Sequence, residues 1–214
     1  MALALAGNSP DGGLGGVQRR RKWALLSSIV LAVAFLAVTS SSWDVGSSLI
    51  YESIEWIGMI LILICVAGRT WCSLYIGGRK KAELVELGPY SIVRNPLYVF
   101  TLIGAVGVGF QTGSLIVGAI CAFATYVIFR RVVVREEAFL AGAFPEAFPI
   151  YAARVPRLWP KLSLWVDTDM FVVAPRPVIR TFADTSLFLI AIPLAEMIDA
   201  LQAGGSLPIL FNLP

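Results

Sequence analysis

Long apolar segments constrain the fold of this chain more than any other feature. The sequence is 57% hydrophobic and only 14% charged, whereas a soluble domain carries about 25% charged residues. A helix of about 20 apolar residues crosses the hydrocarbon core of a bilayer and satisfies its own backbone polar groups there. The apolar segments run from Trp23 to Val38 (extended to Trp43), from about Leu49 to Gly68, from near Leu97 to the GFQTG sequence at 109–113, from about Ser114 to Phe129, and from about Ala183 to Leu201.

These segments predict an all-α, polytopic membrane protein with about five transmembrane helices. Only a tight turn separates the third segment from the fourth, so these two should form a helical hairpin. Residues 1–18 are glycine-rich and indicate a flexible leader, and residues 19–214 indicate a single membrane domain. The order of residue types in 19–43 also fits a cleaved signal peptide, but the basic cluster lies far from the N-terminus, which favours a retained helix. Three residues leave open whether the last segment crosses fully, namely Asp184, Pro193 and Glu196.

Basic residues give this topology a direction. All 17 lysines and arginines lie in four regions, at 19–22, 69–94, 130–135 and 154–180. If the first helix runs outward, these four regions share one side of the membrane, and the loops of the other side contain no basic residue. The positive-inside rule therefore predicts a multi-pass protein of the inner (cytoplasmic) membrane, with its N-terminus and its site on the cytoplasmic side.

The segment from about 135 to 180 differs from the spans because charged residues interrupt its apolar ones. This pattern predicts an amphipathic helix on the cytoplasmic membrane surface. Two prolines in the sequence RVPRLWP (154–160) should then end that helix. The apolar positions of the helix are Phe139, Leu140, Phe144, Phe148 and Tyr151.

Residue types exclude several kinds of site. The chain contains no histidine, and its three cysteines form no CxxC pair. The commonest general base and metal ligand is therefore absent, and the spacing of a metal site is missing. We predict no metal site and interpret the cysteines as small apolar residues of membrane helices. Nothing in the sequence indicates a nucleic-acid partner, and the oligomeric state stays open.

Polar residues precede the third apolar segment, where the chain is about to enter lipid. Asn95 stands before a proline and should be extended, so Pro96 should begin the helix. The backbone N–H donors at a helix start favour an anion, and Arg94 adds a planar guanidinium group that can bind a carboxylate through two hydrogen bonds. The alternative interpretation is an arginine that anchors the topology beside an ordinary Asn-Pro cap.

Two adjacent carboxylates, Glu136 and Glu137, follow the fourth apolar segment beside several arginines. Neighbouring side chains point about 100° apart on a helix, so only one of the two can face a given pocket. One interpretation is a carboxylate that accepts hydrogen bonds from ligand hydroxyls or an ammonium group. The other is an exposed, ion-paired helix segment.

Glycines cluster in the third segment, at Gly104, Gly107 and Gly109. They follow no strand, so a dinucleotide-binding fingerprint is excluded on context. Small residues allow membrane helices to approach closely, and close approach to a flat ligand is the alternative.

Taken in order, four pieces of the chain resemble one family. They are GPYSIVRNPLYVF (88–100), the glycine-bearing hairpin, REEAFL (135–140) and FPIYAARVPRLWP (148–160). Together they resemble the isoprenylcysteine carboxyl methyltransferase and phospholipid methyltransferase superfamily of small integral-membrane enzymes. The resemblance covers about Leu87 to Pro160 and implies S-adenosylmethionine as the cofactor. The family pattern Arg-His-Pro-x-Tyr differs here at one position, where Asn95 replaces the histidine.

The resemblance also assigns residues. It implies catalytic roles for Arg94, Arg154 and Glu137, with Arg154 a candidate for binding the carboxylate of the substrate or of the methionine group. It implies a cofactor site formed by Tyr90, Arg94, Asn95, Pro96, Tyr98, Gly107, Gly109, Glu136, Glu137 and Tyr151. An asparagine can donate and accept hydrogen bonds but carries no proton at neutral pH, so the replacement of the histidine puts any proton-shuttling role in doubt.

The sequence thus predicts a membrane methyltransferase that uses S-adenosylmethionine. Its acceptor should be a lipophilic small molecule or lipid in the membrane, and a carboxylate such as that of a prenylcysteine needs no general base. The alternatives are N-methylation of a phospholipid headgroup, an NADPH-dependent membrane reductase, and a membrane protein without enzymatic activity.

Overall fold

The computed structural model describes residues 39–41, 49–77 and 83–213. The proposed leader 1–18 and the first predicted span, Trp23 to Val38, lie outside the described residues. The described part is mostly helical and has almost no strand, which confirms the all-α prediction. Its longer helices are α2 (Leu49–Ile76), α4 (Pro96–Phe110), α5 (Leu115–Ala143), α7 (Pro175–Ser186) and α8 (Ala191–Ala203), the last two joined by the 3-10 turn η2 (Leu187–Ile190). Its shorter elements are β1 (Thr39–Ser41), α3 (Pro89–Ile92), α6 (Ala147–Arg154), η1 (Leu162–Leu164) and β2 (Phe211–Leu213), and the two strands pair in parallel.

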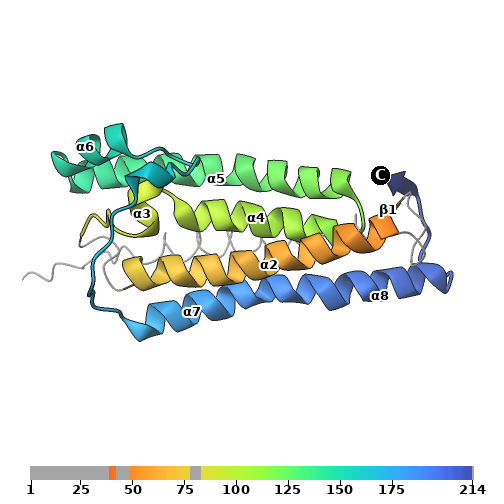
Figure 1. Ribbon diagram of the computed structural model, residues 1–214. Coiled ribbons are helices and arrows are strands. Elements are labelled where there is room, and N and C mark those ends of the chain that lie inside the picture. The colour runs from red at the N-terminus through yellow and green to blue at the C-terminus, as the bar shows by residue number, and fades with distance from the viewer. Residues whose placement is uncertain (1–38, 42–48, 78–82, 214) are drawn as a thin grey trace, which may run out of the picture.

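The long helices lie side by side in one bundle (Figure 1). Helix α2 packs against α4 on one side and against α7 on the other, and α5 packs on α4. Three stretches are long and apolar enough to cross a membrane, namely Leu49–Ile76, Leu115–Ala143 and Pro175–Ala203, and α4 is a shorter apolar helix. The protein is therefore an integral membrane protein by the length and composition of its helices.

The predicted hairpin of the third and fourth segments is present as α4 and α5. Ser114 caps α5, since its hydroxyl oxygen accepts a hydrogen bond from the Val117 amide at 3.3 Å. The helices are packed closely: a Cβ added at Gly109 would lie 2.4 Å from the Cα atom of Gly118 on α5. Helix α5 continues to Ala143, beyond the end of the predicted apolar span near Phe129. Residues 130–143 include several good helix formers and no proline.

The amphipathic segment predicted within 135–180 is divided between the end of α5 and α6. The chain leaves helical geometry at Phe144 and ends α6 at Val155, which is extended because a proline follows it. Phe148, Tyr151 and Val155 form a buried cluster that packs against Leu140 and Phe144 at the end of α5, whereas Phe139 is exposed. The location of this segment on the membrane surface stays a prediction. From there to α7 the chain is irregular apart from η1.

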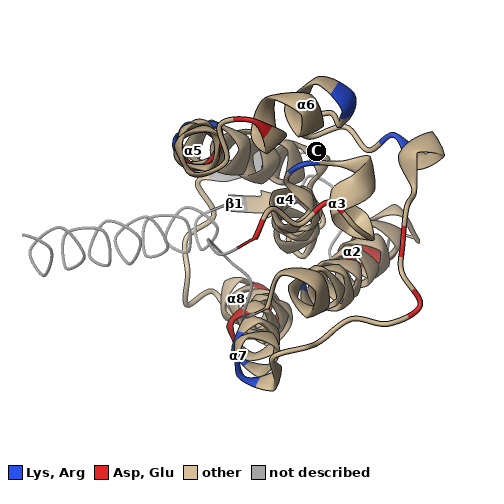
Figure 2. Cartoon of the chain, turned by 90° about the vertical axis from the view of Figure 1, so that its left-hand side faces the viewer, with Lys and Arg blue, Asp and Glu red and all other residues tan. Residues whose placement is uncertain are grey.

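Charged side chains crowd one end of the bundle, where α2 and α5 end and where α4 and α7 begin (Figure 2). Every basic residue that the structure describes lies in that half. The opposite end carries four acidic residues on α2 and α8, namely Glu52, Glu55, Glu196 and Asp199. The pair of α4 and α5 thus places the residues before Pro96 beside those that follow the apolar part of α5.

Candidate functional site

Two motifs distant in the sequence are joined by backbone hydrogen bonds at the charged end of the bundle. The Arg94 amide donates to the Pro156 carbonyl at 2.9 Å, and the Lys161 amide donates to the Ile92 carbonyl at 2.9 Å. The chain before α4 is extended at Val93, so its amides and carbonyls are free to pair in this way. Asn95 was predicted to be extended, but its φ of −125° and ψ of 58° lie outside the extended region. This pairing fixes residues 156–161 against the start of α4.

Glu137 is the centre of the site. Its side chain is only 9% exposed and its Oε2 atom lies 3.3 Å from Nη1 of Arg94 and 2.6 Å from Nη2 of Arg157. Asn95 completes the group, because its Nδ2 atom donates to Oε1 of Glu137 at 3.2 Å and to the Arg157 carbonyl at 3.2 Å. We name these four residues, Arg94, Asn95, Glu137 and Arg157, the Glu137 cluster.

Arg157 did not appear among the residues assigned from the sequence. Its guanidinium makes the closest contact to Glu137, and hydrogen bonding to that carboxylate raises the pKa of Arg157. The sequence RVPRLWP (154–160) shows Arg157 as a candidate cation, but a single arginine between two prolines does not indicate which carboxylate it binds. The sequence interpretation chose the first arginine, Arg154, instead.

The adjacent glutamates diverge, as helical geometry requires. Glu136 turns toward α4, where its Oε2 atom accepts a hydrogen bond from the Tyr98 hydroxyl at 3.0 Å. The Tyr98 ring in turn packs on Phe129, with ring centroids 4.7 Å apart. The two carboxylates therefore contact different partners, although they are adjacent on α5.

Two tyrosines sit behind the Glu137 cluster. The Tyr151 hydroxyl donates to the Tyr90 carbonyl at 2.8 Å, which ties α6 to α3. Burial raises the pKa of both phenols, so both stay protonated at neutral pH. Within the part of the chain that the structure describes, two buried polar atoms have no partner, the Tyr90 hydroxyl and Nε of Arg94. Such side-chain atoms are uncommon in folded proteins, and a catalytic role or a bound water or ion is among the explanations for them.

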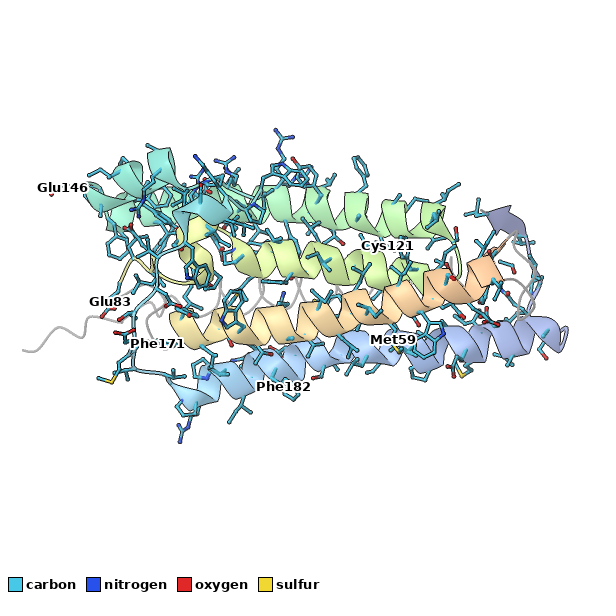
Figure 3. The ribbon with its side chains drawn as sticks, viewed as in Figure 1. Met59, Glu83, Cys121, Glu146, Phe171 and Phe182 are labelled. Atoms are coloured by element: carbon cyan, nitrogen blue, oxygen red, sulfur yellow. The ribbon has the colours of Figure 1, made fainter. Side chains whose placement is uncertain are left out.

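Arg154 lies apart from the Glu137 cluster. Its Nη2 atom contacts Oε2 of Glu86 at 2.7 Å, and the two side chains are 51% and 33% exposed. Glu86 lines a hollow of about 240 Å³ at the charged end of the bundle. Figure 3 labels two of its walls, Glu83 and Phe171, beside the end of α2. The remaining walls are Tyr75, Leu84, Val85 and Leu87.

Gly107 and Gly109 lie along α4, away from the Glu137 cluster. Gly107 is twelve residues beyond Asn95, which corresponds to about 18 Å of helix rise. A Cβ added at Gly107 would lie 2.7 Å from the Gly58 carbonyl oxygen of α2. In the described structure both glycines thus face neighbouring helices rather than the hollow, and a role in cofactor binding stays a prediction.

Comparison with known proteins adds an independent line of evidence. Residues 70–147 match the family profile of phospholipid methyltransferases. The chain is 38% identical over 185 residues to the cobalt-zinc-cadmium resistance protein CzcN of Cupriavidus metallidurans, covering 86% of this chain and 83% of that protein. It is 35% identical over 192 residues to the nickel-cobalt-cadmium resistance protein NccN of Alcaligenes xylosoxydans xylosoxydans, covering 90% of this chain and 88% of that protein. No solved structure matches the chain.

The matched profile begins in α2 and ends at the start of α6, so it includes the start of α4 and both glutamates. The two relatives extend the similarity over most of the chain. On this evidence the chain belongs to the isoprenylcysteine carboxyl methyltransferase and phospholipid methyltransferase family of membrane proteins.

Proposed function

We propose that this protein transfers a methyl group from S-adenosylmethionine to a carboxylate on a lipophilic acceptor. The observation that carries the proposal is the Glu137 cluster, in which one buried carboxylate organises two arginines at the charged end of the bundle. A separate hollow lies at the same end. Family membership supports a methyl donor over a nicotinamide cofactor.

The residues around the hollow suit the proposed cofactor. When bound, S-adenosylmethionine supplies a methyl group that its positively charged sulfur has already activated. Glu86 could accept hydrogen bonds from ribose hydroxyls, Arg154 could pair with the amino-acid carboxylate, and the Tyr75 and Phe171 rings offer apolar walls. The orphaned Nε of Arg94 is a further donor in the neighbouring cluster. A hollow of about 240 Å³ lies just below the usual range for ligand pockets of about 300–1,000 Å³, so we assign it to one end of the cofactor.

The contacts of Glu137 favour a carboxylate acceptor. Its oxygens accept hydrogen bonds from Arg157 and Asn95 and pair with Arg94, so they are poorly placed to remove a proton from an amine. A carboxylate acceptor is already a nucleophile at neutral pH and needs no base. In this proposal the cluster holds the acceptor and orients it toward the methyl donor, and it excludes water from the reacting groups. N-methylation of a headgroup remains the alternative acceptor chemistry.

The site also lies where the two substrates can meet. The charged end of the bundle carries the described basic residues, and we assign that end to the cytoplasm by the positive-inside rule. A polar cofactor would then arrive from the cytosol, and a lipophilic acceptor would arrive through the bilayer. We place the protein in the inner membrane on the same ground.

We also propose that the reaction serves metal resistance, because CzcN and NccN carry resistance names. Within the described residues no group of three cysteine, aspartate or glutamate side chains is arranged to hold a metal ion. That observation favours methylation of a membrane component over direct metal binding. Growth of a deletion strain on cobalt, zinc and cadmium, complemented with wild type or Glu137→Gln, tests this role.

The cofactor is tested by titrating detergent-purified protein with S-adenosylhomocysteine and with NADPH in a calorimeter. We expect binding of the first alone, weakened about tenfold or more in Glu86→Gln and in Arg154→Ala. Arg180→Ala is the matched control, because Arg180 forms an exposed pair with Asp184 on α7. Transfer of labelled methyl groups to membrane lipid extracts and to prenylcysteine analogues then identifies the acceptor. Binding of NADPH instead, or no loss in the two hollow variants, would overturn the assignment.

A further inference from the structure

One arginine lies inside a candidate membrane span. Arg69 is on α2, seven residues before its end at Ile76, which corresponds to about 10 Å of helix rise. Charged residues within membrane helices are costly and are usually functional. Arg69 is half-buried, so its charge is partly shielded from water and depends on its contacts in the protein.

The partners of Arg69 are two threonines on neighbouring helices. Nε donates to the hydroxyl of Thr185 on α7 at 3.0 Å, and Nη1 donates to the hydroxyl of Thr101 on α4. Each hydroxyl proton is already committed, since Thr185 donates to the Thr181 carbonyl and Thr101 donates to the Leu97 carbonyl, both at 2.7 Å. The threonines thus accept from the guanidinium without neutralising its charge.

No carboxylate compensates that charge within the part of the chain that the structure describes. The salt bridges formed there by other arginines leave Arg69 unpaired with an acid, and three of its five N–H groups make no hydrogen bond to a described residue. If Arg69 only joined three helices, a neutral amide side chain could make similar hydrogen bonds with a smaller desolvation penalty. A retained positive charge points instead to an anion that the protein binds.

A second polar group faces the interface where the end of α2 packs against the start of α4, which we call the seam between α2 and α4. The Tyr90 ring packs against Cys72, which is one turn beyond Arg69 on the same face of α2. Leu97, one turn before Thr101 on α4, packs against the same cluster. Tyr90 is 95% buried, since its exposed fraction is 5%, and its hydroxyl is one of the two partnerless buried atoms. Burial raises the pKa of Tyr90, and the positive charge of Arg69 opposes that rise.

We infer that Arg69 and the Tyr90 hydroxyl bind an anionic group of the lipophilic acceptor, a carboxylate or a phosphate, in the seam between α2 and α4. This inference rests on the proposed function and names where its acceptor is recognised. Tyr90 is four residues before Arg94, so α3 connects this part of the chain to the Glu137 cluster. The charged group would enter with its apolar chain in lipid, and its oxygens would meet donors that have no other described partner.

The experiment compares matched pairs of probes in detergent micelles, by equilibrium binding to the full-length protein. One pair is S-farnesyl thioacetic acid and its methyl ester, and the other is dioleoyl phosphatidate and dioleoylglycerol. We expect wild type to prefer the charged member of one pair by about tenfold to a hundredfold, as for a charge-assisted hydrogen bond. The pair that shows the preference distinguishes a carboxylate from a phosphate.

Arg69→Gln should abolish that preference, and Arg69→Lys should retain part of it. Arg130→Gln is the matched control, because Arg130 is an exposed arginine on α5. Tyr90→Phe should fold normally, because its hydroxyl has no described partner, and should reduce the preference about threefold to tenfold. The inference is overturned if wild type does not discriminate within either pair, or if the Arg69 and Tyr90 variants keep the wild-type preference.

Binding of S-adenosylhomocysteine to the same samples separates this inference from the proposed function. Arg69→Gln should bind it as wild type does. If wild type does not bind it, while the charge preference persists and depends on Arg69, the methyl donor is wrong and the anion site stands.

Discussion

The Arg157 guanidinium and the Glu137 carboxylate meet through three contacts. Nη2 of Arg157 lies 2.6 Å from Oε2 of Glu137, and Nε lies 3.0 Å from Oε2 and 3.2 Å from Oε1. The two residues come from α5 and from the irregular segment after α6, which the Arg94 amide also binds at Pro156. This pair therefore holds the returning chain against the start of α4, and it links two of the four pieces that carry the family resemblance, 135–140 and 148–160.

A double-mutant cycle should show that the pair is coupled. We expect Arg157→Ala to lower the free energy of unfolding by about 1 kcal/mol, since its side chain is 48% exposed. Glu137→Ala should cost about 3–5 kcal/mol, because it leaves the buried Arg94 without its partner. The double variant should be less destabilised than the sum of the single ones. Unfolding in detergent by increasing SDS measures all four proteins, with Arg180→Ala as an exposed control, and strict additivity would contradict the coupling.

Asn95 should be replaceable by a donor but not by an acid. Its Nδ2 atom donates to both Glu137 and the Arg157 carbonyl, so Asn95→Asp places a carboxylate against two acceptors. We expect Asn95→Asp to lose about 1–3 kcal/mol of stability, whereas Asn95→His keeps an N–H donor and stays near wild type at neutral pH. Thermal unfolding in detergent compares the variants. An aspartate variant as stable as wild type would show that the amide contacts are unimportant.

The glycines of α4 should affect stability more than cofactor binding. A Cβ at Gly109 would lie 2.4 Å from the Gly118 Cα atom, whereas one at Gly142 on α5 would meet nothing within 4 Å. Gly109→Ala should therefore cost about 1–3 kcal/mol through overpacking, and Gly142→Ala should gain about 0.5–1 kcal/mol. Thermal unfolding and titration with S-adenosylhomocysteine should be measured together. A Gly109→Ala protein of normal stability and weakened affinity would instead support a cofactor role for the glycine.

Tyr90 should make the protein sensitive to alkali. A phenol in the unfolded chain ionises near pH 10, and burial raises the pKa of Tyr90 well above that value. The stability that results is fully present below about pH 10 and is lost as the pH rises toward the folded-state pKa, by up to about 1.4 kcal/mol per pH unit.

Tyr90→Phe removes this titration and a buried hydroxyl without a described partner. The variant should be as stable as wild type or more stable at about pH 8, and should lose less stability at about pH 11. Unfolding midpoints in detergent at the two pH values provide the test. Equal losses in both proteins would mean that the Tyr90 hydroxyl reaches solvent.

Features that depend on neighbours along one helix could be predicted from the residue pattern alone. Apolar length placed the spans from Leu49 onward, the Asn-Pro pair set the start of α4 at Pro96, and the 100° step between adjacent residues separated Glu136 from Glu137. The short link at Gln111–Ser114 was sufficient to predict the hairpin, because so few residues allow only antiparallel neighbours.

Contacts between side chains across the bundle could not be predicted from the sequence and are known only from the folded structure. That structure paired Glu137 with Arg157 and placed Arg154 beside Glu86, although the two arginines are three residues apart and equally suited to bind a carboxylate. It also brought Arg69 to hydroxyls of α4 and α7. The physical reason is that residue spacing fixes a direction only within a regular element. The irregular chain from Val155 to Ala174 can turn many ways, and packing against α3 and α4 selects one of them.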